Sequence, residues 1–474
     1  MVASSFMDRL IAFITSSHDE KIPDALAMQA KYAFLDTFGV ALAGWKEPVV
    51  QIVKRTASKD GAQKASLWGE GTQVRLDDAV LVNGAASHAL DYDDVVTAIL
   101  AHPSAPILAA ALPLAESLQS SGRDVITAYV IGTEVMIKLG IIMGFRHYDL
   151  GWHATDTLGT IGAAAACAYL LRLNPDQTAH AIGIAASTAG GLQKNFGTMT
   201  KPLHVGIASQ HGLRAAFLAR EGLTANREVF ERRGFFYAFS GGLEPGELNQ
   251  NSEDILFGEP FSLLEHGLSV KKFPSCYLTH RIIQGALTAR RETALELRDI
   301  QGVEIETPPG GLVPLIHARP QTGLHGKFSA QYTVLAAIAD GQISLSSFED
   351  EQIQRAEIQT LLSKVKATEA PGVILTGDEM DQKPVRIRIH TKHGVVEKEI
   401  LHTPGSREDP LSAEERKEKW RDCFAYWMKN AGKSFGPNQR KQADLLFEKG
   451  LRLEAYESVS DFLKELPALQ ETKG

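Results

Sequence analysis

Apolar residues recur every three or four positions through most of the first 265 residues, the pattern of helices that bury one face. In the stretch 24–44, for example, Leu26, Ala30 and Phe34 fall on one side. The same spacing predicts helices over residues 105–119, 123–143, 157–172, 176–189 and 203–220. Several of these stretches are rich in alanine and glycine on every side, which is typical of helices inside a bundle. We therefore predict a large helical domain.

The pattern changes near residue 266. Apolar and polar residues then alternate over 301–307, 384–391 and 395–401, as in strands with one face in water. Helical spacing separates these strands, at 282–297, 328–340 and 347–364. From about residue 405 the chain returns to charged amphipathic helices, and we interpret the charged run 414–421 as a solvated helix face. The predicted fold is mainly α, with a helical domain (1–265 and 405–474) and an inserted, smaller α+β domain (266–404).

Composition narrows the functional class. Hydrophobic residues make up 44% and charged residues 22%, as in ordinary soluble globular proteins, and the net charge of −8 disfavours general nucleic-acid binding. Cys167, Cys276 and Cys423 are far apart, which argues against a disulfide framework or a structural zinc site. We identify neither a membrane span nor a signal peptide, and so expect a cytoplasmic protein with no membrane partner.

The stretch densest in functional groups is NGAASHALDYDDVVTAILAHPSAP. We interpret His88 as a packed, hydrogen-bonded helix residue and Asp93 or Asp94 as a cap of the next helix. Asp91 and His102 are the functional candidates, because a histidine in a loop before an apolar helix is suited to the mouth of a site. The spacing of the acidic residues matches neither an EF-hand loop nor a zincin helix, so we predict no metal.

Three further stretches supply imidazoles and lysines. His153 precedes a buried, alanine-rich helix. Pro202 suits the first position of a helix, which puts Lys201 at the N-cap and His204 in the first turn, where a carboxylate would bind. Lys271 precedes an aromatic-proline turn at the boundary between the two domains, a place where ligands often bind. No nucleotide or phosphate-loop motif accompanies these groups, which favours cofactor-free proton transfer on a small polyanion.

Several of these motifs, in their order and spacing, resemble the MmgE/PrpD family, which contains 2-methylcitrate dehydratases, cis-aconitate decarboxylases and iminodisuccinate epimerases. The motifs are HALDYDD, AHPSAP, GWHATDTLGTIGAAAA, TMTKPLHVGIASQHG, KKFPSCYLTH and KFSAQYTVLAAIADG. The resemblance extends over almost the whole chain.

This resemblance implies a homodimer of two-domain subunits, with a metal- and cofactor-free active site in the cleft between the domains. Transferred motif by motif, the family's site residues fall on Asp91, His102, His153, Lys201 and Lys271. The lysines would hold substrate carboxylates and a histidine would move the proton.

We therefore expect a lyase that removes an α-proton from a citrate-like di- or tricarboxylic acid and expels water. An iminodisuccinate-type epimerase, with His102 and His153 on two faces of the substrate, is the first alternative. A cis-aconitate-type decarboxylase is the second, since the resemblance would put Thr-Trp at Val95-Val96 and a histidine at Cys276 in that class. The remaining alternative is a helical binding protein without activity.

Overall fold

The computed structural model describes residues 5–17, 22–375 and 377–466. The chain packs as two units, one formed by residues 1–268 with 416–474 and the other by residues 269–415. Helices account for 58% of the residues and strands for 9%, so the predicted fold class, mainly α with a small α+β region, is confirmed.

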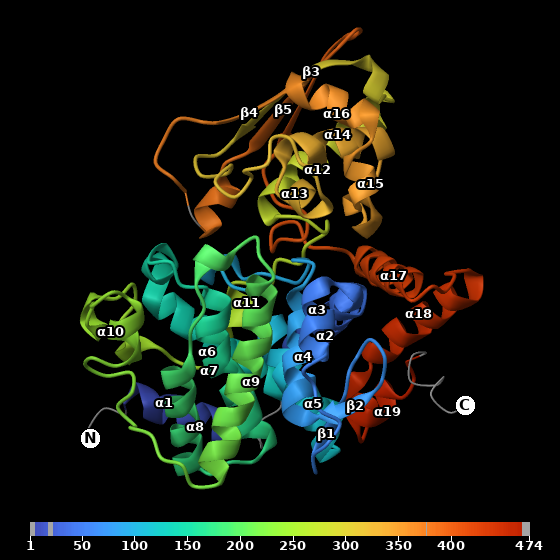
Figure 1. Ribbon diagram of the computed structural model, residues 1–474. Helices are drawn as coiled ribbons and strands as arrows, with labels where there is room; N and C mark the ends of the chain where they lie inside the picture. Colours follow the sequence, from blue (N-terminus) through green and yellow to red (C-terminus); the bar gives the residue numbers. More distant parts are fainter. Residues whose placement is uncertain (1–4, 18–21, 376, 467–474) are drawn as a thin grey trace. The chain divides into compact units, whose positions relative to one another are not determined.

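The first unit is built of helices and carries a small antiparallel sheet, β1 paired with β2 (Figure 1). Its elements are α1 Phe6–Ser16, α2 Asp24–Ala43, α3 Pro48–Lys54, β1 Lys64–Ser66, β2 Gln73–Arg75, α4 Leu76–His88, α5 Ser104–Leu118, α6 Gly122–Asp149, α7 Ala154–Leu170, α8 Pro175–Thr188, α9 Thr200–Arg220, α10 Phe235–Phe239, α11 Ser262–Glu265, α17 Ala413–Asn430, α18 Pro437–Gly450 and α19 Val459–Leu463. The predicted helices of this unit are confirmed, with ends shifted by a few residues.

Helix α6 is long and apolar enough to cross a membrane by length and composition, which the sequence analysis did not recognise. Within the first unit, however, 94% of its most apolar 18-residue window is buried. Ser121 begins this helix with a capping box, in which its side chain accepts from the backbone N–H of Asp124. A helix buried in this way is a core helix of the bundle.

Two glycines let α4 and α9 approach closely. A Cβ added at Gly84 would lie 2.7 Å from the Cα of Gly206, and one added at Gly206 would lie 2.4 Å from the carbonyl oxygen of Leu81. Any larger residue would separate the helices. This crossing matters for the site because His88 ends α4 and Lys201 lies in the first turn of α9.

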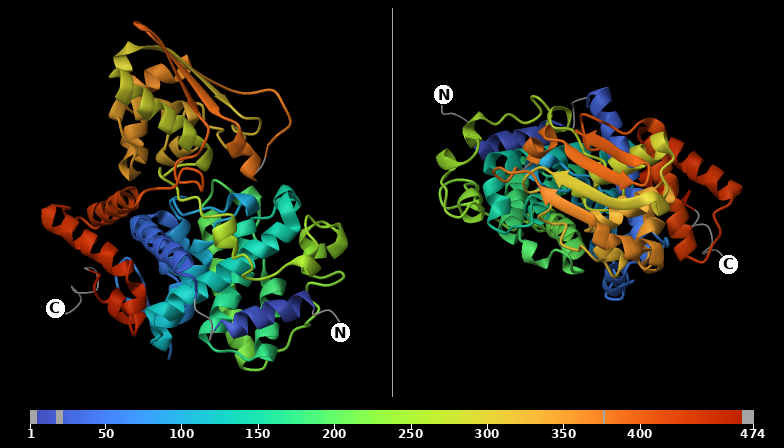
Figure 2. Two further views of the ribbon diagram at one scale, coloured as in Figure 1. Left: turned by 180° about the vertical axis from the view of Figure 1, so that it is seen from behind. Right: turned by 90° about the horizontal axis from the view of Figure 1, so that it is seen from above.

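The second unit is a four-stranded sheet with helices, and the right-hand view of Figure 2 shows its strands side by side. The strand order is β4-β3-β5-β6, with β3 parallel to β4 and the other pairs antiparallel. Its elements are α12 His280–Thr293, β3 Ile300–Thr307, α13 Gly323–Lys327, α14 Ala330–Asp340, α15 Asp350–Ile353, α16 Ala356–Leu361, β4 Val365–Glu369, β5 Val385–Thr391 and β6 Gly394–Ile400.

One face of this sheet is buried, as the alternation predicted. Val303 and Ile305 of β3 pair with Ile389 and Ile387 of β5, and all four are buried, whereas Glu304 between them is exposed. Three strands were predicted correctly, but β4 was missed. The region expected as one helix, 347–364, is broken into short helical turns, and β4 follows it directly.

Candidate active site

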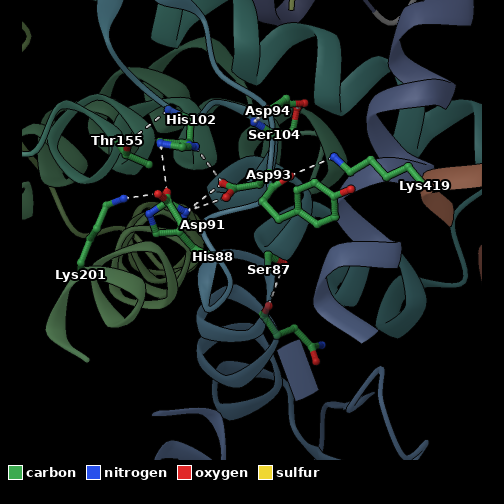
Figure 3. Close-up of polar contacts among 12 residues, drawn as sticks. Ser87, His88, Asp91, Asp93, Asp94, His102, Ser104, Thr155, Lys201 and Lys419 are labelled. Atoms are coloured by element: carbon green, nitrogen blue, oxygen red, sulfur yellow. Dashed lines mark hydrogen bonds and ion pairs between the residues drawn. The ribbon is translucent and has the colours of Figure 1, made fainter. Parts of the chain in front are cut away.

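The functional groups of the first unit converge from four places in the chain. His88 ends α4, and the segment 89–96 that follows reverses at a short bridge between Val96 and Ala101. This turn delivers His102, just before α5 begins. His153 is the N-cap residue of α7, and Lys201 lies in the first turn of α9. Figure 3 shows His88, His102 and Lys201 around the segment, which we call the site loop (residues 89–96).

Asp93 lies at the centre of the cluster and is fully buried. Both of its carboxylate oxygens are 2.9 Å from Nδ1 of His88, and Oδ2 is 3.1 Å from Nδ1 of His102. Burial by itself would raise the pKa of Asp93, but the two imidazoles outweigh it and hold that pKa well below its usual range. Asp93 is therefore an anion that orients both rings.

Lys201 and Asp91 form an ion pair beside His102. Lys201 Nζ lies 2.8 Å from Asp91 Oδ1, and the same oxygen is 3.8 Å from Nε2 of His102. Burial by itself would lower the pKa of Lys201, but the Asp91 carboxylate outweighs it and raises that pKa. Asp91 has a backbone φ of 53°, a left-handed conformation that Asp tolerates better than most residues. The site thus presents an ammonium, a carboxylate and an imidazole together.

His153 and His204 are paired through their Nδ1 atoms, which lie 3.0 Å apart. One of these nitrogens must carry the proton and the other accept it, so the pair contains complementary tautomers. Burial, together with the neighbouring imidazoles and Lys201, lowers the pKa of His153 well below its usual value. Burial and Lys201 also lower the pKa of His204, so a positive charge on His204 for holding a carboxylate is disfavoured.

Asp94 connects the site loop to α5. Its carboxylate accepts from the Oγ of Ser104 at 2.5 Å and, at 3.4 Å, from the backbone N–H of Ser104, the first residue of α5. The hydroxyl of Tyr129 lies 2.7 Å from the same Oγ. Burial and the charge of Asp36 raise the pKa of Asp94 to about 7. The prediction that Asp93 or Asp94 caps the next helix was wrong, because the N-cap residue of α5 is Pro103, and Asp94 contacts the first residue of that helix from the site loop.

Four residues of the cluster also form a set of possible metal ligands. Ligand atoms of His88, Asp91, Asp93 and His102 all lie within 4.8 Å of one another, and imidazoles with carboxylates suit zinc. Against a cation, the Lys201 ammonium lies 2.8 Å from Asp91, where its charge would repel a metal ion. The set fits a hydrogen-bonded proton-transfer cluster better than a metal centre.

Five of the six predicted site residues belong to this cluster: Asp91, His102, His153, Lys201 and His204. The sixth, Lys271, is a buried residue of the second unit. The prediction that Lys201 is the N-cap was wrong by two residues, since α9 begins at Thr200 and its N-cap is Met199.

The interpretation of His88 as a packed, hydrogen-bonded helix residue agrees with the structure, in which it ends α4, is buried and bonds to Asp93. The sequence did not predict that Asp93 is its partner inside the cluster, nor that the hydroxyl of Thr155 accepts from the backbone N–H of His102 at 3.1 Å. The density of acids and imidazoles within fifteen residues was the available signal for Asp93.

Comparison with known proteins identifies the family. The model of the MmgE/PrpD N-terminal domain matches residues 8–248, and that of the C-terminal domain matches residues 273–435. The chain belongs to the MmgE/PrpD family. It is 29% identical to mouse cis-aconitate decarboxylase, over 89% of this chain and 87% of the relative. The human enzyme of the same name is 30% identical, over 86% of each chain.

A fungal protein is also similar to this chain. The cis-aconitate decarboxylase of Aspergillus terreus is 27% identical over 85% of this chain and 86% of the relative. Together the relatives mark this MmgE/PrpD protein as an enzyme of the lyase type. At these levels of sequence identity the relatives show the family but not the reaction, so the reaction has to be inferred from the chemistry of the site.

Proposed function

We propose that this MmgE/PrpD enzyme is a cofactor-independent lyase that removes an α-proton from a citrate-like di- or tricarboxylic acid and eliminates water. The observation that carries the proposal is the Asp93–His102 pair beside the Asp91–Lys201 ion pair. The names of the relatives support the substrate class, because cis-aconitate is itself a tricarboxylic acid.

His102 is the base in this proposal. Its Nδ1 lies 3.1 Å from an Asp93 carboxylate oxygen, and its other ring nitrogen, Nε2, is available to take the α-proton. The C–H electrons then form the enolate and, as the β-hydroxyl leaves as water, the new C=C bond. Buried anionic Asp93 stabilises the imidazolium that forms, as a carboxylate does for the histidine of a catalytic triad.

Lys201 stabilises the enolate in this proposal. An α-carboxylate becomes a dianion when the proton leaves, and a fixed ammonium lowers the energy of that charge in a site of low dielectric. Asp91 holds the ammonium in place at 2.8 Å. The imidazolium of His102 then gives its proton to the departing hydroxyl, and His153, whose neutral ring is fixed by His204, is the candidate to hydrogen-bond and orient that hydroxyl.

Decarboxylation of cis-aconitate is the second candidate, and the relatives favour it. It needs the same stabilised carbanion, but the bond that breaks is C–CO2 and the carbanion is then protonated. The difference from the decarboxylase pattern at Val95 and Cys276 is the reason to prefer elimination. Epimerisation of an iminodisuccinate-type acid needs a proton donor on each face, for which His102 and His153 are the pair.

One experiment separates these reactions. The purified enzyme is incubated in D2O with citrate, 2-methylcitrate, cis-aconitate or iminodisuccinate, and proton NMR follows each acid. Loss of water with a new vinyl or allylic signal is the expected result. Release of CO2 would instead establish decarboxylation, and α-deuteration without elimination would establish epimerisation. No change in any of the four acids would contradict the proposed substrate class.

A further inference from the structure

Lys419 of α17 is buried, although it lies in the charged run 414–421 that was predicted to be solvated. Its Nζ is 2.7 Å from Oδ1 of Asp36 and donates to the backbone carbonyl of Tyr92 at 2.9 Å. The ammonium also lies 4.0 Å from the centroid of the Tyr92 ring. The prediction of a solvated face was therefore wrong at this position.

Asp36 neutralises the charge of Lys419, but it is not the only acceptor that Lys419 contacts. Burial raises the pKa of Asp36, and the Lys419 ammonium opposes that rise. An ion pair with Asp36 neutralises the charge of Lys419, but a buried ammonium has three N–H donors and needs acceptors besides that carboxylate. The bond to Tyr92 in addition connects a helix near the end of the chain to the middle of the site loop, 327 residues earlier.

Tyr92 separates the two carboxylates of the cluster. Asp91 on one side holds Lys201, and Asp93 on the other orients His88 and His102. In Figure 3 Lys201 and Lys419 approach the loop from opposite sides of the view. Because Asp91 has a left-handed φ of 53°, the loop has no regular hydrogen-bond ladder at this point, and its carbonyls need partners from elsewhere.

We infer that Lys419 is a positioning residue for the reaction: by holding the Tyr92 carbonyl it fixes the backbone from which Asp91 and Asp93 reach Lys201 and His102. The inference rests on the proposed function in that these groups perform the chemistry. Misplacement of reacting groups by about 1 Å costs about 100-fold in rate, so a loop fixed by one buried ammonium is sensitive to its loss.

The first test compares variants on α17 and its partner. Lys419→Met keeps the apolar stem and removes the donor, and we expect kcat to fall about 10- to 100-fold with a smaller change in KM. Lys419→Arg should recover part of the loss. Asp36→Asn disturbs the same ion pair but leaves the bond to Tyr92, and should lower the melting temperature with little loss of kcat. Lys417→Met, whose partner is Glu448 at the surface, is the matched control on the same helix.

A double-mutant cycle separates positioning from stability. In an Asp91→Asn background, Lys419→Met should cost less kcat than in the wild type, because one of the two groups that it positions is already gone. A wild-type kcat in folded Lys419→Met would overturn the inference. So would equal losses in Lys419→Met and Asp36→Asn at equal melting temperature.

The second test needs no substrate, so it stands even if none of the four acids is turned over. Hydrogen–deuterium exchange of the peptide covering the site loop should be faster in Lys419→Met than in wild type, and unchanged in Lys417→Met. If Lys419→Met does not fold, Lys419→Gln and Lys419→Arg take its place, with faster exchange expected for Gln than for Arg. Wild-type exchange in the folded variants would overturn the inference.

Discussion

The site loop has two sides of different character. On one side the side chains of Asp91, His102 and Lys201 are between 12% and 18% exposed to solvent. On the other side the side chain of Lys419 is 4% exposed and Asp94 is fully buried. Both sides use charged groups, but charges that retain some exposure can meet a substrate, whereas buried ones can only hold the chain. The comparison teaches that polar density in the sequence does not by itself separate reacting groups from supporting ones.

The largest effect should come from His102 on the exposed side. His102→Asn removes the base, so kcat should fall roughly 10²- to 10⁴-fold while the substrate still binds. The measurement is kcat together with wash-in of solvent deuterium at the α-carbon. If the variant exchanged the α-proton at the wild-type rate, His102 would not be the base and the assignment of the two sides would fail.

His153→Ala tests whether the second histidine also takes part in exchange of the α-proton. In an elimination with one base the variant should still exchange the α-proton while turnover slows, because the ring acts only on the leaving hydroxyl. An epimerase needs both imidazoles, and would lose exchange on one face. Loss of all exchange in His153→Ala, with exchange retained in His102→Asn, would reverse the roles of the two histidines.

The next largest effect should come from Lys201. Removing a charge-assisted contact costs roughly 1.5 to 3 kcal/mol, so Lys201→Ala should lower kcat/KM about 10- to 150-fold, with a fall in kcat because the ammonium stabilises the enolate. Lys194→Ala, an exposed lysine in the segment before α9, is the matched control. A wild-type kcat/KM in Lys201→Ala would show that the ammonium serves only to hold Asp91.

A smaller effect concerns stability at acid pH. Burial lowers the pKa of His88 to about 4, and it lowers that of His147, outside the cluster, to about 4. Between pH 6.5 and about 4 these histidines are therefore protonated in the unfolded chain but neutral in the folded protein, so the free energy of unfolding falls as pH falls. Asp94, with its pKa raised to about 7, acts in the opposite direction over the whole of this range.

Urea unfolding across this pH range measures the balance. We expect the imidazoles to dominate, and His147→Gln to flatten the dependence while leaving the cluster intact. A free energy of unfolding that stays constant or rises toward pH 4 would show that the buried carboxyls dominate instead.

The smallest effect is expected from metal removal. Because Lys201 lies beside Asp91, dialysis against EDTA should leave turnover unchanged. Activity lost to EDTA and restored by a divalent ion would make His88, Asp91, Asp93 and His102 metal ligands and overturn the proton-transfer interpretation of the exposed side.

The sequence by itself determined the fold class, because burial imposes a period of 3.6 on helices and 2 on strands. It therefore predicted α2 and α5 to α9, three of the four strands of the second unit, and the stretches that carry Asp91, His102, His153 and Lys201. It failed at β4, a strand of five residues that is too short for the alternation to be recognised.

Only the tertiary structure decided which polar groups meet. His88 and Asp93 bond because the chain reverses between them, and His153 meets His204 because α7 and α9 begin close together. Lys419 looked like any lysine of a charged helix, and its partner Asp36 is far away in the sequence. Local spacing records which face of an element is buried, but the pairing of buried charges depends on long-range packing, which a pattern along one chain does not contain.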